Sequence, residues 1–160
     1  MLTVPFFKQD TGYSCGPATL QMVLRYYNIV MSEEDLIKKL HANKENGTLH
    51  KPMIALCQKE GLYVYVNNDS SLEEIGGFLE HKIPVVIHFI EPSECDGHYS
   101  VVVGIEDDTV VLNDPWNGEK FRMTKKDFMK EWHSEDGVHK KWMMAVSDRG
   151  FPLGKQYLPV

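Results

Sequence analysis

Residues 9–20 run Gln9-Asp10-Thr11-Gly12-Tyr13-Ser14-Cys15-Gly16-Pro17-Ala18-Thr19-Leu20 and join a polar loop to a helical pattern. After Gly16-Pro17, apolar side chains follow with the spacing of one helix face: Leu20, Val23, Leu24 and Tyr27. Proline suits the first turn of a helix because its missing N–H costs no hydrogen bond there. The stretch therefore predicts a helix that begins directly after Cys15 and buries one face.

Beyond this helix, helical patterns come first along the chain and strand patterns come later. Ser32 is expected to cap a second helix that contains Leu40, and Gly61 is expected to end a third helix over about residues 51–60. The remaining patterns predict helices at residues 71–79 and 125–131 and strands at residues 62–66, 84–90, 99–105, 109–112, 119–123 and 142–146. Because helices and strands cluster separately instead of alternating, we expect an α+β fold.

Length and composition place the chain among ordinary globular domains. Its 160 residues match one domain, and 42% hydrophobic with 25% charged residues is typical of a folded protein. The net charge is −6, with lysines scattered beside acids, whereas a nucleic-acid partner needs a basic footprint. We therefore expect no nucleic-acid partner, one domain over residues 1–147, and an irregular tail over residues 148–160.

Signals for membranes, secretion and disulfide bonds are weak. The best apolar run, residues 83–90, is broken by Pro84 and His88 and is shorter than the roughly 18 residues that span a bilayer. The N-terminus has neither the basic region nor the long apolar stretch of a signal peptide. Cys15, Cys57 and Cys95 are too few and too irregularly spaced for a disulfide framework. We expect no membrane span and a reducing, cytoplasmic location.

Cys15 is the first candidate for chemistry. Its position before a helix would place the sulfur near the unpaired N–H groups of the first turn, and these groups favour a thiolate. A thiolate attacks carbonyl carbon, and the small neighbours Ser14 and Gly16 leave room for a substrate. Cys15 is therefore the candidate nucleophile, although a free cysteine is more often buried and inert.

His98 is the best candidate for a catalytic base. It stands where a loop, Asp96-Gly97, enters the strand expected at residues 99–105, so a rigid element would hold it within reach of solvent. His88 is the main rival, but it lies inside an apolar strand and is more often a core or sheet-face residue. The other histidines lie in polar segments and are expected at the surface: His41, His50, His81, His133 and His139.

Asp114 follows the next strand and could orient the imidazole of His98 by accepting its other N–H. The Asn-Asp-Pro sequence around it is also ordinary turn chemistry. If residues 106–108 form a three-residue loop, Ser100 faces Asp114, and His98 and Asp114 become diagonal neighbours on one sheet face. A two-residue turn would put them on opposite faces. The pairing therefore predicts an odd-length loop or a β-bulge between the two strands.

Gln9 completes the candidate site. It lies six residues before Cys15 in a polar stretch. A side-chain amide there could donate to the oxyanion that forms when a thiolate attacks a carbonyl, together with the backbone N–H of Cys15. By itself a glutamine in a loop carries no such meaning.

The combination of these four residues resembles a known family. Gln9, Cys15-Gly16, His98-Tyr99 and Asp114-Pro115 are similar in order and spacing to the motifs of the papain-like peptidases that remove double-glycine leader peptides from bacteriocins, and of their stand-alone relatives. The likeness runs from about residue 4 to residue 116, and we expect it to extend to residue 146. It implies a papain-like fold with an N-terminal helical half packed on an antiparallel sheet.

The resemblance also implies an activity and the role of each site residue. It implies a cysteine peptidase or amidase that cleaves a peptide or peptide-like amide through a thioacyl intermediate. Cys15 would be the nucleophile, His98 the general base and acid, Asp114 the residue that orients His98, and Gln9 part of the oxyanion hole. Two alternatives remain open: an acyltransferase with the same triad, and an inactive peptide-binding or adaptor module.

Other kinds of site have less support in the sequence. Neither His133 with His139 nor Cys57 with Cys95 has a recognised zinc spacing, so we expect no metal or other cofactor. The acidic residues 106–108 fit a solvated turn better than a calcium loop. Three tryptophans could line a groove, but large aromatic side chains mostly fill cores: Trp116, Trp132 and Trp142.

Overall fold

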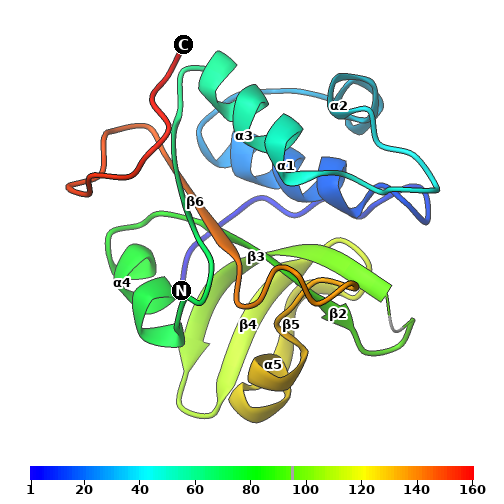
Figure 1. The fold of residues 1–160 in the computed structure, drawn as a ribbon, viewed down its shortest axis with the longest axis vertical. Helices are drawn as coiled ribbons and strands as arrows, with labels where there is room; N and C mark the ends of the chain where they lie inside the picture. Colours follow the sequence, from blue (N-terminus) through cyan, green and yellow to red (C-terminus); the bar gives the residue numbers. More distant parts are fainter. Residues whose placement is uncertain (95) are drawn as a thin grey trace.

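The computed structural model describes residues 1–94 and 96–160, so the expectation that Cys95 belongs to no disulfide framework lies outside the described residues. Three helices form one side of the molecule: α1 (Cys15–Tyr26), α2 (Glu33–Leu40) and α3 (His50–Lys59). They pack together above a sheet, and α4 (Leu72–Glu80) and α5 (Lys125–Glu131) lie below it (Figure 1). The predicted α+β fold, with a helical half packed on a sheet, is confirmed.

Within residues 1–94 and 96–160 the sheet has six strands, and every adjacent pair is antiparallel. Their order across the sheet is β1-β6-β2-β3-β4-β5, so β6, the last strand in the chain, lies between β1 and β2. The strands span β1 (Tyr63–Asn67), β2 (Val85–Glu91), β3 (Asp96–Glu106), β4 (Thr109–Asp114), β5 (Gly118–Thr124) and β6 (Met143–Ser147).

Two hydrophobic cores lie on the two faces of the sheet. The first joins α1, α2 and α3 to the sheet through fully buried residues such as Leu24, Leu36 and Val101. The second joins α4 and α5 to the opposite face through Ile75, Phe128 and their neighbours. The period-2 pattern of the strands produces this division, because alternate side chains point to opposite faces. The helices are thus held on both sides of the strands that carry His98 and Asp114.

Local capping chemistry sets where several helices begin. The Ser32 hydroxyl accepts a hydrogen bond from the backbone N–H of Asp35 at 3.1 Å, as the sequence predicted. Ser71 caps α4 and Thr124 caps α5 in the same way, at 3.0 Å and 3.1 Å. All predicted helices and strands are present, with ends shifted by a few residues at most.

The β3–β4 hairpin contains the irregularity that the His98–Asp114 pairing predicted. The strands are joined by a two-residue turn, with Glu106 opposite Thr109. A register shift between Val102 and Gly104 then inserts one extra residue into β3. Beyond this bulge, Val101 faces Asn113, so by register Ser100 faces Asp114. The bulge therefore returns His98 and Asp114 to one sheet face, which the short turn alone would not do.

The two chain ends pack on the sheet. The backbone N–H of Leu2 donates to the carbonyl of Val103, in the bulge, at 2.8 Å. Near the other end, Tyr157 exchanges two backbone hydrogen bonds with Val64, at 2.7 and 3.0 Å, along the outer edge of β1. Phe151 is buried in the second core. Residues 148–160, all of them described, form no helix or strand apart from this bridge, and they are nevertheless attached to the domain.

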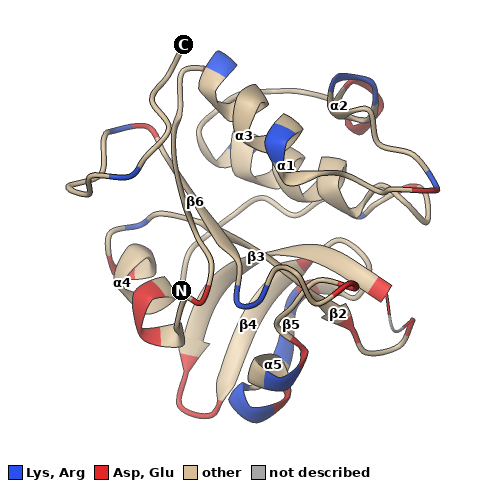
Figure 2. Ribbon diagram, viewed as in Figure 1, with Lys and Arg blue, Asp and Glu red and all other residues tan. Residues whose placement is uncertain are grey.

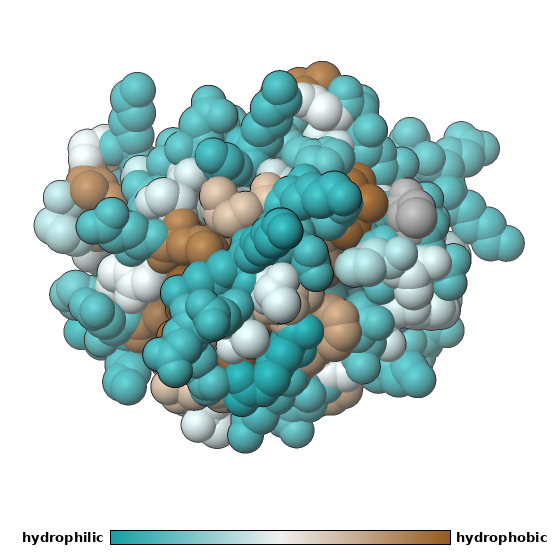
Figure 3. All heavy atoms as spheres, turned by 90° about the horizontal axis from the view of Figure 1, so that it is seen from below, coloured by the Kyte–Doolittle hydropathy of each residue, from teal (hydrophilic) through white to brown (hydrophobic). Residues whose placement is uncertain are grey.

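Charged groups and apolar side chains are distributed over the surface without one dominant patch on the faces seen. Acidic residues lie on α4, at the β3–β4 turn and around the β2–β3 hairpin, whereas basic residues gather on α5 beside acids (Figure 2). The face seen from below carries small, separate hydrophobic areas among hydrophilic side chains (Figure 3). Across residues 1–94 and 96–160, no helix is long and apolar enough to cross a membrane.

The first core makes a quantitative prediction. Leu24 is 0% exposed, so Leu24→Ala should lower the free energy of unfolding by about 2–5 kcal/mol through lost burial and a residual cavity. The matched change Leu158→Ala removes a side chain that is 57% exposed and should cost less than about 0.5 kcal/mol. Urea unfolding of both variants measures the difference. Equal losses would show that α1 does not contribute its apolar face to the core.

Candidate active site

Cys15 is the first residue of α1, where the sequence placed it. Its side chain is nearly buried, at 9% exposure, and the helix beyond it is closed by a hydrogen bond from the N–H of Ala18 to the carbonyl of Ser14 at 3.0 Å. The N–H groups of the first turn have no partner within the helix. Cys15 therefore lies at the end of the helix where backbone donors favour negative charge.

Position 16 requires glycine, because the loop before α3 approaches the backbone there too closely for a Cβ atom. A Cβ atom at this position would lie 2.5 Å from Oγ1 and 2.6 Å from Cβ of Thr48. Thr48 is held in turn, because its carbonyl accepts a hydrogen bond from the hydroxyl of Tyr99 at 2.7 Å. The residue next to His98 thus fixes the loop that packs against the residue next to Cys15.

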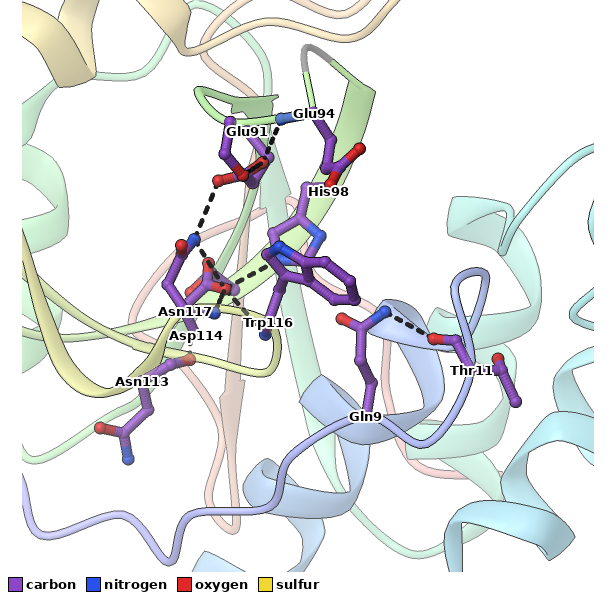
Figure 4. A network of polar contacts seen from close by, with 11 residues as sticks. Gln9, Thr11, Glu91, Glu94, His98, Asn113, Asp114, Trp116 and Asn117 are labelled. Atoms are coloured by element: carbon purple, nitrogen blue, oxygen red, sulfur yellow. Dashed lines mark hydrogen bonds and ion pairs between the residues drawn. The ribbon is translucent and has the colours of Figure 1, made fainter.

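His98 and Asp114 form a buried hydrogen-bonded pair. Nε2 of His98 lies 2.9 Å from Oδ1 of Asp114, and the two side chains are 8% and 0% exposed (Figure 4). The ring of His98 packs edge-on against Phe89, its partner across β2 and β3, at a centroid distance of 5.6 Å. Because Asp114 occupies Nε2, Nδ1 is the ring nitrogen left for a second partner.

The Cys15 thiol is close enough to this ring to alter its protonation. Burial is the largest influence on His98 and by itself lowers the pKa of the ring. Hydrogen bonds to Asp114 and to Cys15, together with the charges of both groups, outweigh it and raise the pKa of His98 to about 10. The imidazole is therefore a cation at neutral pH, with Asp114 and Cys15 as its neighbours. The structure brings Cys15, His98 and Asp114 together.

Gln9 reaches the same end of the sheet from the N-terminal segment. Its backbone N–H donates to the carbonyl of Pro115 at 2.9 Å, directly after Asp114. The side chain is 7% exposed, and its Nε2 donates to the carbonyl of Thr11 at 2.7 Å (Figure 4). A primary amide has two N–H donors, so one remains for another acceptor.

Two polar residues of this network were missed by sequence reasoning. Asn117 donates from Nδ2 to Oε1 of Glu91 at 3.0 Å and to Oδ1 of Asp114 at 3.3 Å (Figure 4). Glu91 ends an apolar strand, and Asn117 lies in the turn that follows Asp114. The available signal in the sequence was Glu91 itself, because a charged residue directly after a buried apolar strand indicates a polar partner.

The other histidines partly contradict the sequence expectation. His50 and His139, expected at the surface, are half-buried and face each other at a ring distance of 4.5 Å. His50 also stacks on Trp142 at 3.8 Å and shares a hydrogen bond of 3.0 Å with His88. Burial and neighbouring histidines lower the pKa of His50 to about 3 and that of His88 to about 4, so both are neutral at pH 7.

The correction has a physical reason: α3 brings His50 against the sheet, a tertiary contact that the polarity of its own segment does not reveal. His133 is likewise half-buried, whereas His41 and His81 are exposed as expected.

Trp132 and Trp142 fill the cores, and Trp116 is 42% exposed. Among the described residues, no group of three or more His, Cys, Asp or Glu is placed to hold a metal ion.

The remaining described cysteine is chemically different from Cys15. Cys57 is a free thiol at 0% exposure in the first core, and burial raises its pKa to about 12. It is therefore a neutral core residue at physiological pH. This contrast supplies an internal reference for the reactivity of Cys15.

Comparison with known proteins identifies the family. The Peptidase_C39 like family matches over residues 1–139. The chain belongs to this family. The protein is accordingly a cysteine peptidase. It is also similar to FapD of Pseudomonas fluorescens, a probable functional amyloid protease, with 29% identity over 131 residues, which are 79% of this chain and 56% of FapD.

Solved structures of other peptidases have the same fold. The peptidase domain of Streptococcus ComA, a bifunctional ABC transporter of a quorum-sensing pathway, is 22% identical with a TM-score of 0.74, and the match covers 92% of this chain and 100% of that domain. A double-glycine-motif protease from an AMS/PCAT transporter, in complex with its leader peptide, is 20% identical with a TM-score of 0.71, covering 91% of each chain. The predicted family resemblance is confirmed.

The contact at Gly16 generates a prediction. Gly16→Ala should destabilise the fold by about 1–3 kcal/mol and slow alkylation of Cys15, because the new methyl group overlaps Thr48. The matched variant Gly12→Ala, with nothing within 4 Å of its new Cβ, should do neither. Adding Thr48→Gly to Gly16→Ala should restore both the stability and the alkylation rate, since it removes all three contacting atoms. Denaturant midpoints and alkylation rates test this, and a harmless Gly16→Ala would contradict it.

The charge state of His98 generates a second prediction. Its pKa in the folded protein, about 10, lies above the ordinary 6.5, so its stabilising contribution is complete below pH 6.5 and is lost as pH rises through about 10. Ring titration of labelled His98 by NMR should therefore give a midpoint far above 6.5. The midpoint should fall in Cys15→Ala and in Asp114→Asn, because each removes a partner of the cation. An ordinary midpoint in the unmodified protein would contradict the ion-pair description.

Proposed function

We propose that this peptidase hydrolyses peptide bonds with Cys15, His98 and Asp114 as a catalytic triad and Gln9 as an oxyanion donor. The observation that carries the proposal is the buried His98 ring, which lies 2.9 Å from Asp114 and next to Cys15 at the start of α1. A cation at this position stabilises a thiolate, which is the nucleophilic form of cysteine. Membership of the peptidase family supports the same assignment.

Acylation follows from this arrangement. The Cys15 sulfur forms a bond to the carbonyl carbon of the substrate, and the carbonyl electron pair moves to oxygen. The free N–H of the Gln9 amide and the backbone N–H of Cys15 then donate to that oxyanion. As the C–N bond breaks, the proton on Nδ1 of His98 goes to the leaving amine nitrogen, which leaves a thioester on Cys15 and a neutral imidazole.

Deacylation reverses these roles. A water molecule attacks the thioester carbon, and Nδ1 of His98 takes its proton. The C–S bond breaks, the carboxylic acid product leaves, and the thiolate–imidazolium pair is restored. Asp114 accepts from Nε2–H throughout, so the ring presents the same nitrogen in both steps.

The substrate class proposed is an extended peptide segment. Cysteine peptidases of this family act on peptide bonds, and the double-glycine-motif protease of similar fold was solved with a leader peptide bound. A cavity of about 490 Å³ between α4 and the N-terminus, beside Leu72, Gly76 and Val103, does not contain the triad. We expect the peptide to bind at Cys15 instead.

Chemical labelling and turnover test the proposal together. Iodoacetamide near pH 7 should alkylate Cys15 at least about 100-fold faster than Cys57, and His98→Ala should remove most of that advantage. Peptide hydrolysis should vanish in Cys15→Ala and fall by about 100- to 10,000-fold in His98→Ala. Mass spectrometry of the products, with an added amine nucleophile, separates hydrolysis from acyl transfer.

The Gln9 assignment has its own control. Gln9→Ala should lower kcat by about 100- to 1,000-fold with little change in KM, because the donor acts on the oxyanion and not on the bound peptide. Gln58→Ala removes a glutamine whose amide bonds the Leu158 carbonyl, far along α3, and should leave kcat unchanged. If Cys15 is alkylated as slowly as Cys57 and no peptide is hydrolysed, the result would instead support an inactive peptide-binding module.

A further inference from the structure

An amide side chain bridges two buried carboxylates next to His98. Asn117 directs its Nδ2 group to Oε1 of Glu91 at 3.0 Å and to Oδ1 of Asp114 at 3.3 Å (Figure 4). Glu91 is on β2 and Asp114 on β4, and the strand that separates them is β3, which carries His98. The bridge therefore crosses the strand of the catalytic base and ties together its two neighbours.

The surroundings of Glu91 favour its ionised form, which accepts hydrogen bonds. It is 2% exposed, and its Oε2 accepts from the hydroxyl of Ser93 and the backbone N–H of Glu94, both at 2.7 Å. Burial acts to raise its pKa, but the hydrogen bonds from Ser93, Asn117 and the following turn prevail and lower the pKa below its usual value. A carboxylate accepts but cannot donate, so it fixes which end of the Asn117 amide faces it.

The orientation of Asn117 determines what Asp114 meets. Oδ1 of Asp114 accepts from Nε2 of His98, from the backbone N–H groups of Trp116 and Asn117 at 2.9 Å each, and from Nδ2 of Asn117. Oδ2 is buried and has no partner among the described residues. All the donors thus act on one oxygen and oppose rotation of the carboxylate. If the amide of Asn117 turned over, its oxygen would face Asp114 and repel it.

We propose that Glu91 is a positioning residue for the catalytic triad: by orienting the Asn117 amide, it holds Oδ1 of Asp114 on Nε2 of His98. The inference rests on the proposed function, because it assigns Glu91 and Asn117 an effect on catalysis only through Asp114 and His98. Neither residue touches the reacting atoms. Their contribution is to keep the imidazole in one tautomer and one direction.

Three variants test the proposal. Asn117→Ala cuts the bridge at an exposed position, where the fold tolerates change, and Glu91→Gln replaces the obligate acceptor by an amide that can also donate. Glu94→Gln is the matched control: it makes the same charge change three residues away, at an exposed side chain whose backbone alone contacts Glu91. Near-ultraviolet circular dichroism and the protection of Cys57 from alkylation report whether each variant is folded.

The primary readout is the NMR titration of the His98 ring, with the pH profile of Cys15 alkylation beside it. Asn117→Ala and Glu91→Gln should each lower the His98 midpoint by about one pH unit, the effect of one charge-assisted hydrogen bond, and lower kcat with KM unchanged. Glu94→Gln should leave both unchanged. Glu91→Gln should have no further effect when Asn117→Ala is already present, since both act through one path.

The outcomes separate this proposal from the proposed function. If the unmodified protein shows fast Cys15 alkylation that depends on His98, while folded Asn117→Ala and Glu91→Gln keep its titration and kcat, only the positioning role is overturned. Additive effects of the two changes would also overturn it, because Glu91 would then act without Asn117. If Cys15 of the unmodified protein reacts no faster than Cys57, the triad itself fails.

Discussion

The site depends on a charged hydrogen bond enclosed in protein, between Nε2 of His98 and Oδ1 of Asp114 at 2.9 Å. Removing a carboxylate from water is costly, and at 0% exposure Asp114 is stable only because several donors converge on it. Much of the surrounding architecture serves to bring these donors together. The bulge in β3 aligns the two strands, and the turn after β4 supplies two backbone N–H groups.

The same pair explains why two halves of the molecule are needed. The helical half contributes Cys15 at the start of α1, and the sheet contributes His98 and Asp114. Contacts across the boundary fix their relative position: Tyr99 holds the loop of Thr48 against Gly16, and Gln9 binds the backbone after Asp114. The neutral pair of His50 and His88 adds a further contact between α3 and β2. The relative position of Cys15 and His98 thus depends on packing far from the sulfur.

Much of this could be predicted from sequence because the decisive signals were local. The spacing of Leu20, Val23 and Leu24 predicts the first helix. Counting the strand register from the turn shows that His98 and Asp114 share a sheet face only if the loop has an odd number of residues or one strand contains a bulge. What sequence could not supply was tertiary. The carbonyl of Val103, in the bulge, binds the N-terminal segment, which is distant in sequence. Glu91 meets Asn117 only once β2 and β4 lie on either side of β3. His50 was misassigned for the same reason.

A crystal structure of the protein after reaction with a peptide aldehyde would test the central claim most directly. The account predicts a covalent bond to the Cys15 sulfur, Nδ1 of His98 within about 4 Å of that sulfur, and Asp114 on Nε2. The oxygen of the adduct should accept from the Cys15 backbone and from the Gln9 amide. An adduct on another residue, or a His98 ring turned away from the sulfur, would contradict the account.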